Sequence, residues 1–276
     1  MVLPALAWPR DPRWWQMAFQ ALLFGCGVAM RDFSIGGMQV LATFLAGLAA
    51  QAVWLRALRL RNPGYRSACI TCFGLCLLLR ADNPYVHPLA AALALSSKFL
   101  LRVRGKHVWN PANLGAMMAL LVLPGAWVSP GQWGSDLAWL GWLGALGFWV
   151  ALRAQRLDAS AVFLLAWIAL TSFRMWYFHI PWEQWLHSLD NGALLLFAFF
   201  MLSDPKTLPD HPLARAGFAG WVAFLAFLIQ YWLFIPNGFL WSLFLSVPLV
   251  PLLDRLWPGQ RYSWAESQPE TGADRN

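Results

Sequence analysis

The stretch KFLLRVRGKHVWNPANLGAMMALLVLP, residues 98–124, decides how this chain folds. Its first part predicts a basic hairpin tip that carries Arg102, Arg104, Lys106 and His107. Asn110 is a good N-cap residue, and Pro111 suits the first helical position, where the missing N–H would have no helical partner. The apolar helix that follows, residues 112–123, is too short to cross a bilayer core unaided. A helix N-terminus at membrane depth with basic side chains beside it predicts a site for an anion or a polar headgroup.

The composition is that of a membrane protein. Of the 276 residues, 59% are hydrophobic and 12% are charged, whereas a soluble domain carries about 25% charged residues. The net charge of +7 comes from basic residues that flank apolar segments, which is the pattern of membrane proteins. We therefore expect the lipid bilayer as a partner and no nucleic acid.

Ten apolar segments follow one another along the chain. They cover residues 14–30, 37–58, 66–79, 85–101, 111–124, 135–152, 159–176, 189–203, 213–234 and 237–253. The third, fifth and eighth are shorter than the ~20 residues that a full crossing needs. With the N-terminus placed in the cytoplasm, the outer loops of this ten-segment arrangement receive only Arg31, Arg80 and Arg174 out of 20 basic residues. This bias predicts a multi-pass protein of a bacterial-type inner membrane with both termini cytoplasmic.

The two halves of the chain resemble each other. Asp82-Asn83-Pro84 ends the third segment as Asp204-Pro205 ends the eighth, and asparagine opens the fifth and the tenth. Five crossings in each half make the halves inverted repeats. The predicted fold is therefore all-α, with a cytoplasmic segment 1–13, repeats at 14–124 and 135–256, and a disordered cytoplasmic tail 257–276.

Short segments interrupted by Pro or Gly at matching places in inverted halves indicate a binding site near the membrane midplane. The predicted site, for an ion, a flavin or another polar ligand, uses residues at the helix starts and helix ends. Its members are Asn110, Asn113, Asn237, Asp82, Asn83, Asp204 and Lys206.

Three motifs in this order resemble a known family. They are Asn-Pro-Ala at 110–112, Ser-Asp-Pro-Lys-Thr at 203–207 and Pro-Asn-Gly at 236–238. Over residues 20–256 the chain resembles the family that contains the B-type membrane subunit of the sodium-pumping NADH:quinone oxidoreductase and the D-type membrane subunit of the Rnf ferredoxin:NAD oxidoreductase. The resemblance implies ten helices in a urea-transporter-like inverted repeat. It also implies a place beside other membrane redox subunits, in a flavin-carrying electron pathway coupled to ion movement.

One loop departs from that family. Members with a covalent flavin carry Ser-Gly-Ala-Thr after the Asn-Pro-Ala helix, whereas the loop here, residues 125–136, has the sequence GAWVSPGQWGSD and contains no Thr. We therefore do not expect covalent FMN, and a non-covalent flavin is the cofactor that the resemblance leaves open. The chain looks like a reduced relative, of the kind also found outside the large complexes.

Two other functions stay open. The same core could serve as a stand-alone channel or transporter with no redox role, or as a membrane component of a natural-product biosynthetic pathway. The sequence also leaves open whether the chain is itself a catalyst. We find no catalytic triad, no Gly-rich nucleotide loop and no paired acid/base carboxylates in it. Any redox chemistry would then belong to a cofactor or a partner.

Cys69, Cys72 and Cys76 are spaced to lie on one face of the third segment. Three thiols on one face could bind a metal or an iron–sulfur centre, with a fourth ligand from elsewhere. The alternative is that these small residues let helices pack closely. A single helix presents its ligands in a line, which favours the packing interpretation.

Two features near the expected membrane surfaces have simple interpretations. Lys98 ends the fourth segment, and its side chain is expected to extend to the membrane interface. Residues 181–188, PWEQWLHS, are expected to form an amphipathic turn at the outer interface.

Overall fold

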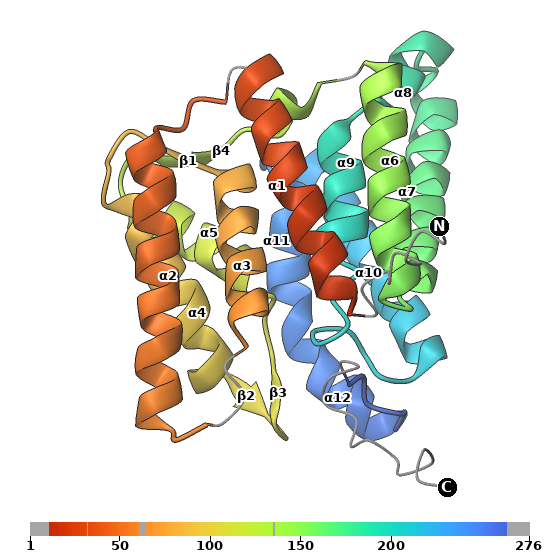
Figure 1. Ribbon diagram of the computed structural model, residues 1–276. Coiled ribbons are helices and arrows are strands. Elements are labelled where there is room, and N and C mark those ends of the chain that lie inside the picture. The colour runs from red at the N-terminus through yellow and green to blue at the C-terminus, as the bar shows by residue number, and fades with distance from the viewer. Residues whose placement is uncertain (1–10, 32, 61–63, 135, 264–276) are drawn as a thin grey trace, which may run out of the picture.

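All ten apolar segments form helices in the computed structural model, which describes residues 11–31, 33–60, 64–134 and 136–263 (Figure 1). Most of the predicted segment 1–13, and residues 264–276 of the predicted tail, lie outside the described residues. The helices stand side by side with their axes roughly aligned, as expected for a bundle in a membrane.

The first half contains five helices and two strand pairs. Its helices are α1 (Pro12–Met30), α2 (Gly37–Ala57), α3 (Tyr65–Leu78), α4 (Val86–Leu100) and α5 (Pro111–Val122). Strand β1 (Leu79–Ala81) directly follows α3 and pairs antiparallel with β4 (Ala126–Val128), which follows α5. The short helices α3 and α5 therefore end at one shared strand pair.

The predicted basic hairpin is confirmed. Strands β2 (Arg102–Val103) and β3 (Lys106–His107) pair antiparallel. Arg104 and Gly105 form the turn, with φ of 52° and 80°. Two successive positive φ angles are typical of the tight turns that join two strands.

The second half begins with the 3₁₀ turn η1 (Pro130–Trp133) and contains broken helices. Its elements are α6 (Leu137–Arg153), α7 (Leu157–Phe178), α8 (Trp182–Leu189), α9 (Gly192–Leu196), η2 (Phe197–Met201), α10 (Pro212–Tyr231), α11 (Gly238–Ser246), η3 (Val247–Leu249) and α12 (Val250–Leu256). The segment η2 is π-helical, and η3 is a 3₁₀ turn at the point where the tenth segment carries two prolines. The expected amphipathic turn at 181–188 is a short helix, α8, with no buried residue.

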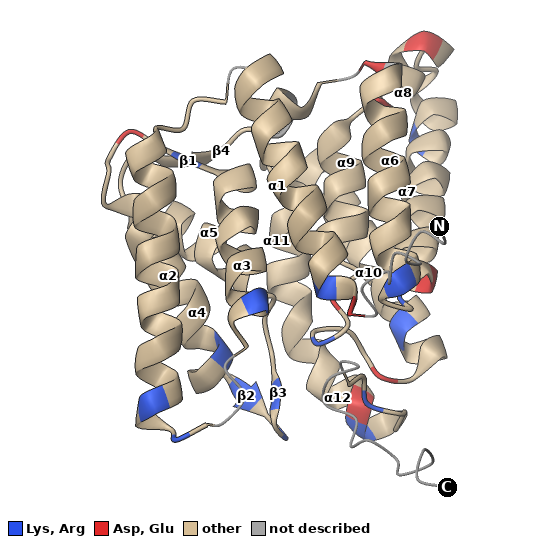
Figure 2. Cartoon of the chain, in the orientation of Figure 1, with Lys and Arg blue, Asp and Glu red and all other residues tan. Residues whose placement is uncertain are grey.

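The outer surface of the bundle is apolar. Four helical stretches are long and apolar enough to cross a membrane: Gly37–Ala57, Leu157–Phe178, Pro212–Tyr231 and Gly238–Leu256. Large apolar side chains on two of them are exposed, for example Leu45 at 61% and Leu165 at 67%. Charged residues lie mainly toward the ends of the bundle (Figure 2). These features are those of a multi-pass membrane protein.

The two halves contain similar pairs of packed helices. α2 packs on α4 as α7 packs on α10, and α4 packs on α5 as α10 packs on α11. A glycine permits each broken helix to approach its neighbour. A Cβ on Gly115 of α5 would lie 2.8 Å from the Ala90 oxygen, and a Cβ on Gly238 of α11 would lie 2.9 Å from the Ala226 oxygen.

Candidate functional site

A cavity of about 540 Å³ lies between the two halves. Residues of α1, α3, α5, α6, α9, η2 and α11 line it, so the broken helices of both halves reach the same space. Four of the predicted site residues line this cavity: Asn110, Asp204, Lys206 and Asn237. Its volume is within the range of sites that bind cofactors and other small molecules.

Asn110 caps α5 as predicted. Its backbone is extended, and its side-chain oxygen accepts a hydrogen bond from the Asn113 backbone N–H at 3.1 Å. Its Nδ2 donates to the Asp204 carboxylate at 3.1 Å. One amide thus caps a helix of the first half and contacts a loop of the second half.

Asp204 is fixed by several hydrogen bonds where the chain leaves the π-helical segment η2. Besides Asn110, its carboxylate accepts the backbone N–H of Lys206 at 3.0 Å. Burial raises the pKa of Asp204, and it lowers the pKa of Lys206. The Lys206 ammonium turns toward the C-terminal segment, where it donates to the Tyr262 carbonyl at 2.8 Å. Both residues were predicted from the sequence as site residues; the structure places them at the cavity and gives their hydrogen-bond partners.

Asn113 connects the broken helices instead of lining the cavity. It is 1% exposed, and its Nδ2 donates to the Leu240 carbonyl at 3.1 Å and approaches the Met201 sulfur at 3.6 Å. Its Oδ1 has no hydrogen-bond partner within the part of the chain that the structure describes. The side chain therefore joins α5 to α11 and to η2.

Asn237 opens α11 in a different way from Asn110. Its φ of 62° is left-handed, and its side chain makes no capping hydrogen bond. Asparagine and glycine adopt this conformation most readily, which explains the Asn-Gly pair at this helix start. Among the described residues, the Asn237 Oδ1 is buried in the cavity wall with no hydrogen-bond partner.

Asp82 and Asn83 lie away from the other predicted site residues. Both are exposed in the turn between β1 and α4, and neither lines the cavity. The Asp82 N–H donates to the Gly125 carbonyl at 3.1 Å, and the Asn83 side chain accepts the Tyr85 N–H at 2.9 Å. Their position at a matching chain turn was visible in the sequence, but these contacts hold the turn itself.

The three cysteines of α3 do not come together as metal ligands. Cys72 and Cys76 are buried and all three thiols are free. Across residues 11–31, 33–60, 64–134 and 136–263, no group of three His, Cys, Asp or Glu residues is placed to hold a metal ion. Cys72 packs where α3 meets α2, with its sulfur 3.7 Å from the Thr43 carbonyl. The observed contacts are those of the packing interpretation.

Lys98 is a cavity residue that sequence reasoning missed. It was expected to extend to the membrane interface, but it is 9% exposed and lines the cavity. Its Nζ donates to the Ser67 hydroxyl of α3 at 3.1 Å. A lysine in the last turn of a helix can extend to the membrane interface or line a cavity. The local sequence is the same in both cases, so no signal in the sequence distinguishes the two positions.

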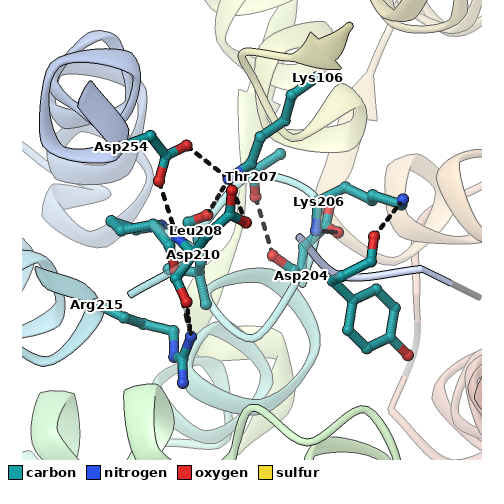
Figure 3. A network of polar contacts seen from close by, with 10 residues as sticks. Lys106, Asp204, Lys206, Thr207, Leu208, Asp210, Arg215 and Asp254 are labelled. Atoms are coloured by element: carbon teal, nitrogen blue, oxygen red, sulfur yellow. Dashed lines mark hydrogen bonds and ion pairs between the residues drawn. The ribbon is translucent and has the colours of Figure 1, made fainter. Parts of the chain in front are cut away.

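A charged network of Lys106, Asp210 and Asp254 lies beside the polar end of the cavity (Figure 3). Lys106 of the hairpin contacts Asp210 at 3.0 Å and Asp254 at 2.9 Å, and Asp254 also accepts the Asp210 backbone N–H. These residues come from β3, from the loop before α10 and from α12. The network joins the first half to the end of the second.

Much of the remaining cavity lining is apolar and partly aromatic. It includes Phe197, Phe200 and Met201 of η2, Ile70, Gly74 and Leu77 of α3 and Trp133 of η1, with Gln20, Gln51 and Thr71 as polar members. A π-helical turn shifts side chains out of the ordinary helical register and is frequent at functional sites. The cavity thus has a polar end around Lys98 and Asp204 and a mostly apolar part.

Comparison with known proteins agrees with the resemblance drawn from the motifs. The model of the NQR2, RnfD, RnfE family matches residues 125–263. Three similar relatives are each named as the D-type subunit of an ion-translocating oxidoreductase complex. The relative from Mannheimia succiniciproducens is 31% identical over 129 residues, covering 44% of this chain and 36% of the relative. The relative from Haemophilus ducreyi is 33% identical over 69 residues (25% and 20%), and that from Stutzerimonas stutzeri is 36% identical over 77 residues (28% and 22%).

These matches span from a fifth to just over a third of the relatives' own length. The family match begins at the loop after α5 and runs through the whole second half, including the Ser-Asp-Pro and Pro-Asn-Gly motifs that border the cavity. Because this match covers half of the chain, the chain belongs to the NQR2, RnfD, RnfE family.

Proposed function

We propose that this protein is an integral membrane subunit of an ion-translocating, Rnf/Nqr-like electron-transfer assembly. Its family membership is the observation that carries this proposal, together with relatives that are named as subunits of such a complex. Its place would be a bacterial-type inner membrane with both termini in the cytoplasm. Other membrane redox subunits would be its partners.

Ten crossings in two inverted repeats form the proposed core. The matched packing of α2 on α4 and α7 on α10 supports this arrangement, as do the glycines at which α5 and α11 contact their neighbours. The two broken helices meet through Asn113 and Leu240. Such a meeting of broken helices is typical of transporter sites at the repeat interface.

The central cavity is the proposed site for a non-covalent flavin. Its volume suits a small cofactor, and Phe197, Phe200 and Trp133 supply aromatic and apolar walls for a planar ring system. A bound flavin would supply the electron-transfer chemistry. The residues of the chain would hold the ring in the apolar part and keep water away from it.

No covalent phosphoester link to a threonine is part of this proposal. The loop at 125–136 lacks Thr, and two threonines elsewhere in the chain are engaged in other contacts. Thr207 is buried and donates to the Asp204 carbonyl at 3.3 Å, and Thr171 is buried and donates to the Trp167 carbonyl at 2.9 Å.

The test is to purify the protein in mild detergent and examine it before and after denaturation. We expect flavin absorbance and fluorescence in the native protein and no fluorescent band on a denaturing gel. A fluorescent band would overturn the non-covalent assignment. Colourless protein that also fails to take up added flavin would overturn the flavin site.

A stand-alone channel is the second candidate, because the cavity reaches from the Lys98 and Lys206 end to Val128 and Trp133 near the opposite strand pair. Isolation from native membranes distinguishes the two candidates. Recovery together with redox subunits supports the first, whereas solute flux through liposomes that contain this protein alone supports the second.

A further inference from the structure

We propose that the polar end of the central cavity binds the anionic group of an amphiphilic ligand, a phosphate or a carboxylate, through the buried ammonium of Lys98. The ligand's apolar or aromatic body would lie along the apolar part of the cavity. Like the proposed flavin site, this one places a ligand in the cavity, and it rests on that part of the proposed function.

Lys98 is the observation on which the anion site depends. An ammonium has three donors, and among the described residues Ser67 is the one hydrogen-bond partner of Lys98. Within that part of the chain, no carboxylate lies within 4 Å of it, although Asp11, Asp158, Asp210 and Asp254 all form close ion pairs elsewhere. A buried charge is costly unless it is paired. An anion from a ligand would supply the missing partner.

The carboxylate that interacts electrostatically with Lys98 already accepts hydrogen bonds from other residues. Asp204 interacts electrostatically with Lys98, but its carboxylate oxygens accept hydrogen bonds from the Asn110 side chain and from the Lys206 backbone N–H. Lys206, Arg102 and Arg261 also line this end of the cavity, so cations outnumber the acidic side chains Asp204 and Asp210 there. Two further cations that line the cavity are paired with carboxylates: Lys106 with Asp210 and Asp254, and Arg13 with Asp11.

His107 lies close to several of the same cations. It lies in the hairpin and lines this end of the cavity. Burial, and then the neighbouring cations Lys98, Arg102, Lys206 and Lys106, lower its pKa to about 3. Burial is the larger cause, and the four cations beside the imidazole add a positive potential, which favours an anion.

The apolar lining of the rest of the cavity favours an amphiphilic ligand. Ile70, Gly74, Leu77 and Phe200 line the space that continues from Lys98 between α3 and η2. A free inorganic anion would fill only the polar end of a cavity of about 540 Å³. A molecule with one anionic end and an elongated apolar body would match both parts.

The experiment uses two ligand pairs that differ only at the anionic group, with purified full-length protein from which bound flavin has been removed. FMN is compared with riboflavin, and dodecyl phosphate with dodecanol, by calorimetric titration in a neutral detergent. We expect each phosphate to bind at least about tenfold more tightly than its neutral counterpart, as a buried charge pair allows. The variant Lys98→Met should abolish the difference.

Arg56→Met is the matched control. Arg56 is an exposed basic residue in the last turn of α2 that does not line the cavity, so the variant loses the same unit charge and should bind like the wild type. Methionine has a volume similar to that of the lysine stem, and thermal unfolding of Lys98→Met in detergent checks that the variant is folded before it is titrated. A fall in binding therefore reports the site and not misfolding.

The outcomes separate this proposal from the flavin site. Equal binding of FMN and riboflavin, unchanged in Lys98→Met, overturns the anion site and leaves the flavin site standing. Lys98-dependent binding of dodecyl phosphate with no binding of either flavin supports the anion site and overturns the flavin site. Phosphate binding that survives in Lys98→Met overturns the role of Lys98.

Discussion

Asn110 donates a hydrogen bond from Nδ2 to the Asp204 carboxylate at 3.1 Å, across 94 residues of sequence. The same side chain accepts the Asn113 backbone N–H, so it caps α5 while it contacts the second half of the chain. Asp204 in turn lies where the π-helical segment η2 ends. This pair places the start of one broken helix against the end of another at the polar end of the cavity.

Asn110→Leu should damage ligand binding more than folding. It removes a helix cap worth about 1 kcal/mol and leaves Asp204 with one donor fewer. It also replaces a polar cavity wall by an apolar one. Thermal unfolding in detergent and titration with the ligands above check this. Asn110→Ser keeps a capping hydroxyl and should recover the stability without the contact to Asp204. Wild-type binding by Asn110→Leu would show that the residue is a cap and no more.

Asn237→Leu should behave differently from its counterpart, because Asn237 makes no capping hydrogen bond. Its left-handed φ of 62° is costly for leucine, and we expect a loss of about 1 kcal/mol of unfolding free energy. Asn237→Gly should be tolerated, since glycine adopts this conformation freely. Thermal unfolding of both variants in detergent measures the difference. If the glycine variant were the less stable of the two, the side chain of Asn237, and not its left-handed backbone, would account for the asparagine at this helix start.

Lys106→Met should destabilise the protein strongly. The ammonium lies between the carboxylates of Asp210 and Asp254 at 3.0 and 2.9 Å, in a largely buried network. Removing it leaves two carboxylates without their cation, which costs roughly 3–5 kcal/mol for a buried pair. Differential scanning calorimetry measures the loss. Adding Asp254→Asn to Lys106→Met should restore part of it, and no restoration would mean that lost packing of the lysine stem is the cause.

Stability should fall in mild acid because of His107. Burial and four nearby cations lower its folded-state pKa to about 3, whereas the pKa in the unfolded chain is about 6.5. Between these values the unfolded chain binds the proton more strongly. Stability is therefore complete above about pH 6.5 and is lost as the pH falls toward 3, by roughly 1–2 kcal/mol between pH 7 and pH 5.

The measurement for His107 is the unfolding temperature as a function of pH. His107→Gln should flatten the dependence between pH 7 and pH 5, since the titrating group is gone. His187→Gln, at an exposed position of α8, should leave it unchanged. An identical slope in His107→Gln would assign the acid sensitivity to another group.

Reporter fusions should give opposite locations for the two ends of α6. A fusion after Arg156 is expected in the cytoplasm, and one near Gln132 is expected outside, since α6 (Leu137–Arg153) separates the two positions. An alkaline phosphatase and a fluorescent protein reporter at each position make the assay reciprocal. Both positions on one side of the membrane would contradict the ten-crossing arrangement and the inverted repeat.

The sequence by itself determined the local structure. Apolar runs and their Pro and Gly boundaries placed the helices. The Asn-Pro pair placed the start of α5, and the basic run around Gly105 placed the hairpin. These features depend on neighbours in the chain, because capping, turn formation and apolar periodicity act over a few residues.

Only the tertiary structure decided which of these residues share a site. Asp82 and Asn83 stand at the same kind of chain turn as Asp204, yet they are exposed while Asp204 contacts Asn110. Lys98 lines the cavity because α3 brings Ser67 to it. Asn237 does not cap α11 with its side chain, since its backbone adopts a left-handed conformation where the helix start packs against α10. In each case the outcome depends on contacts between segments far apart in the sequence, and local pattern carries no information about those contacts.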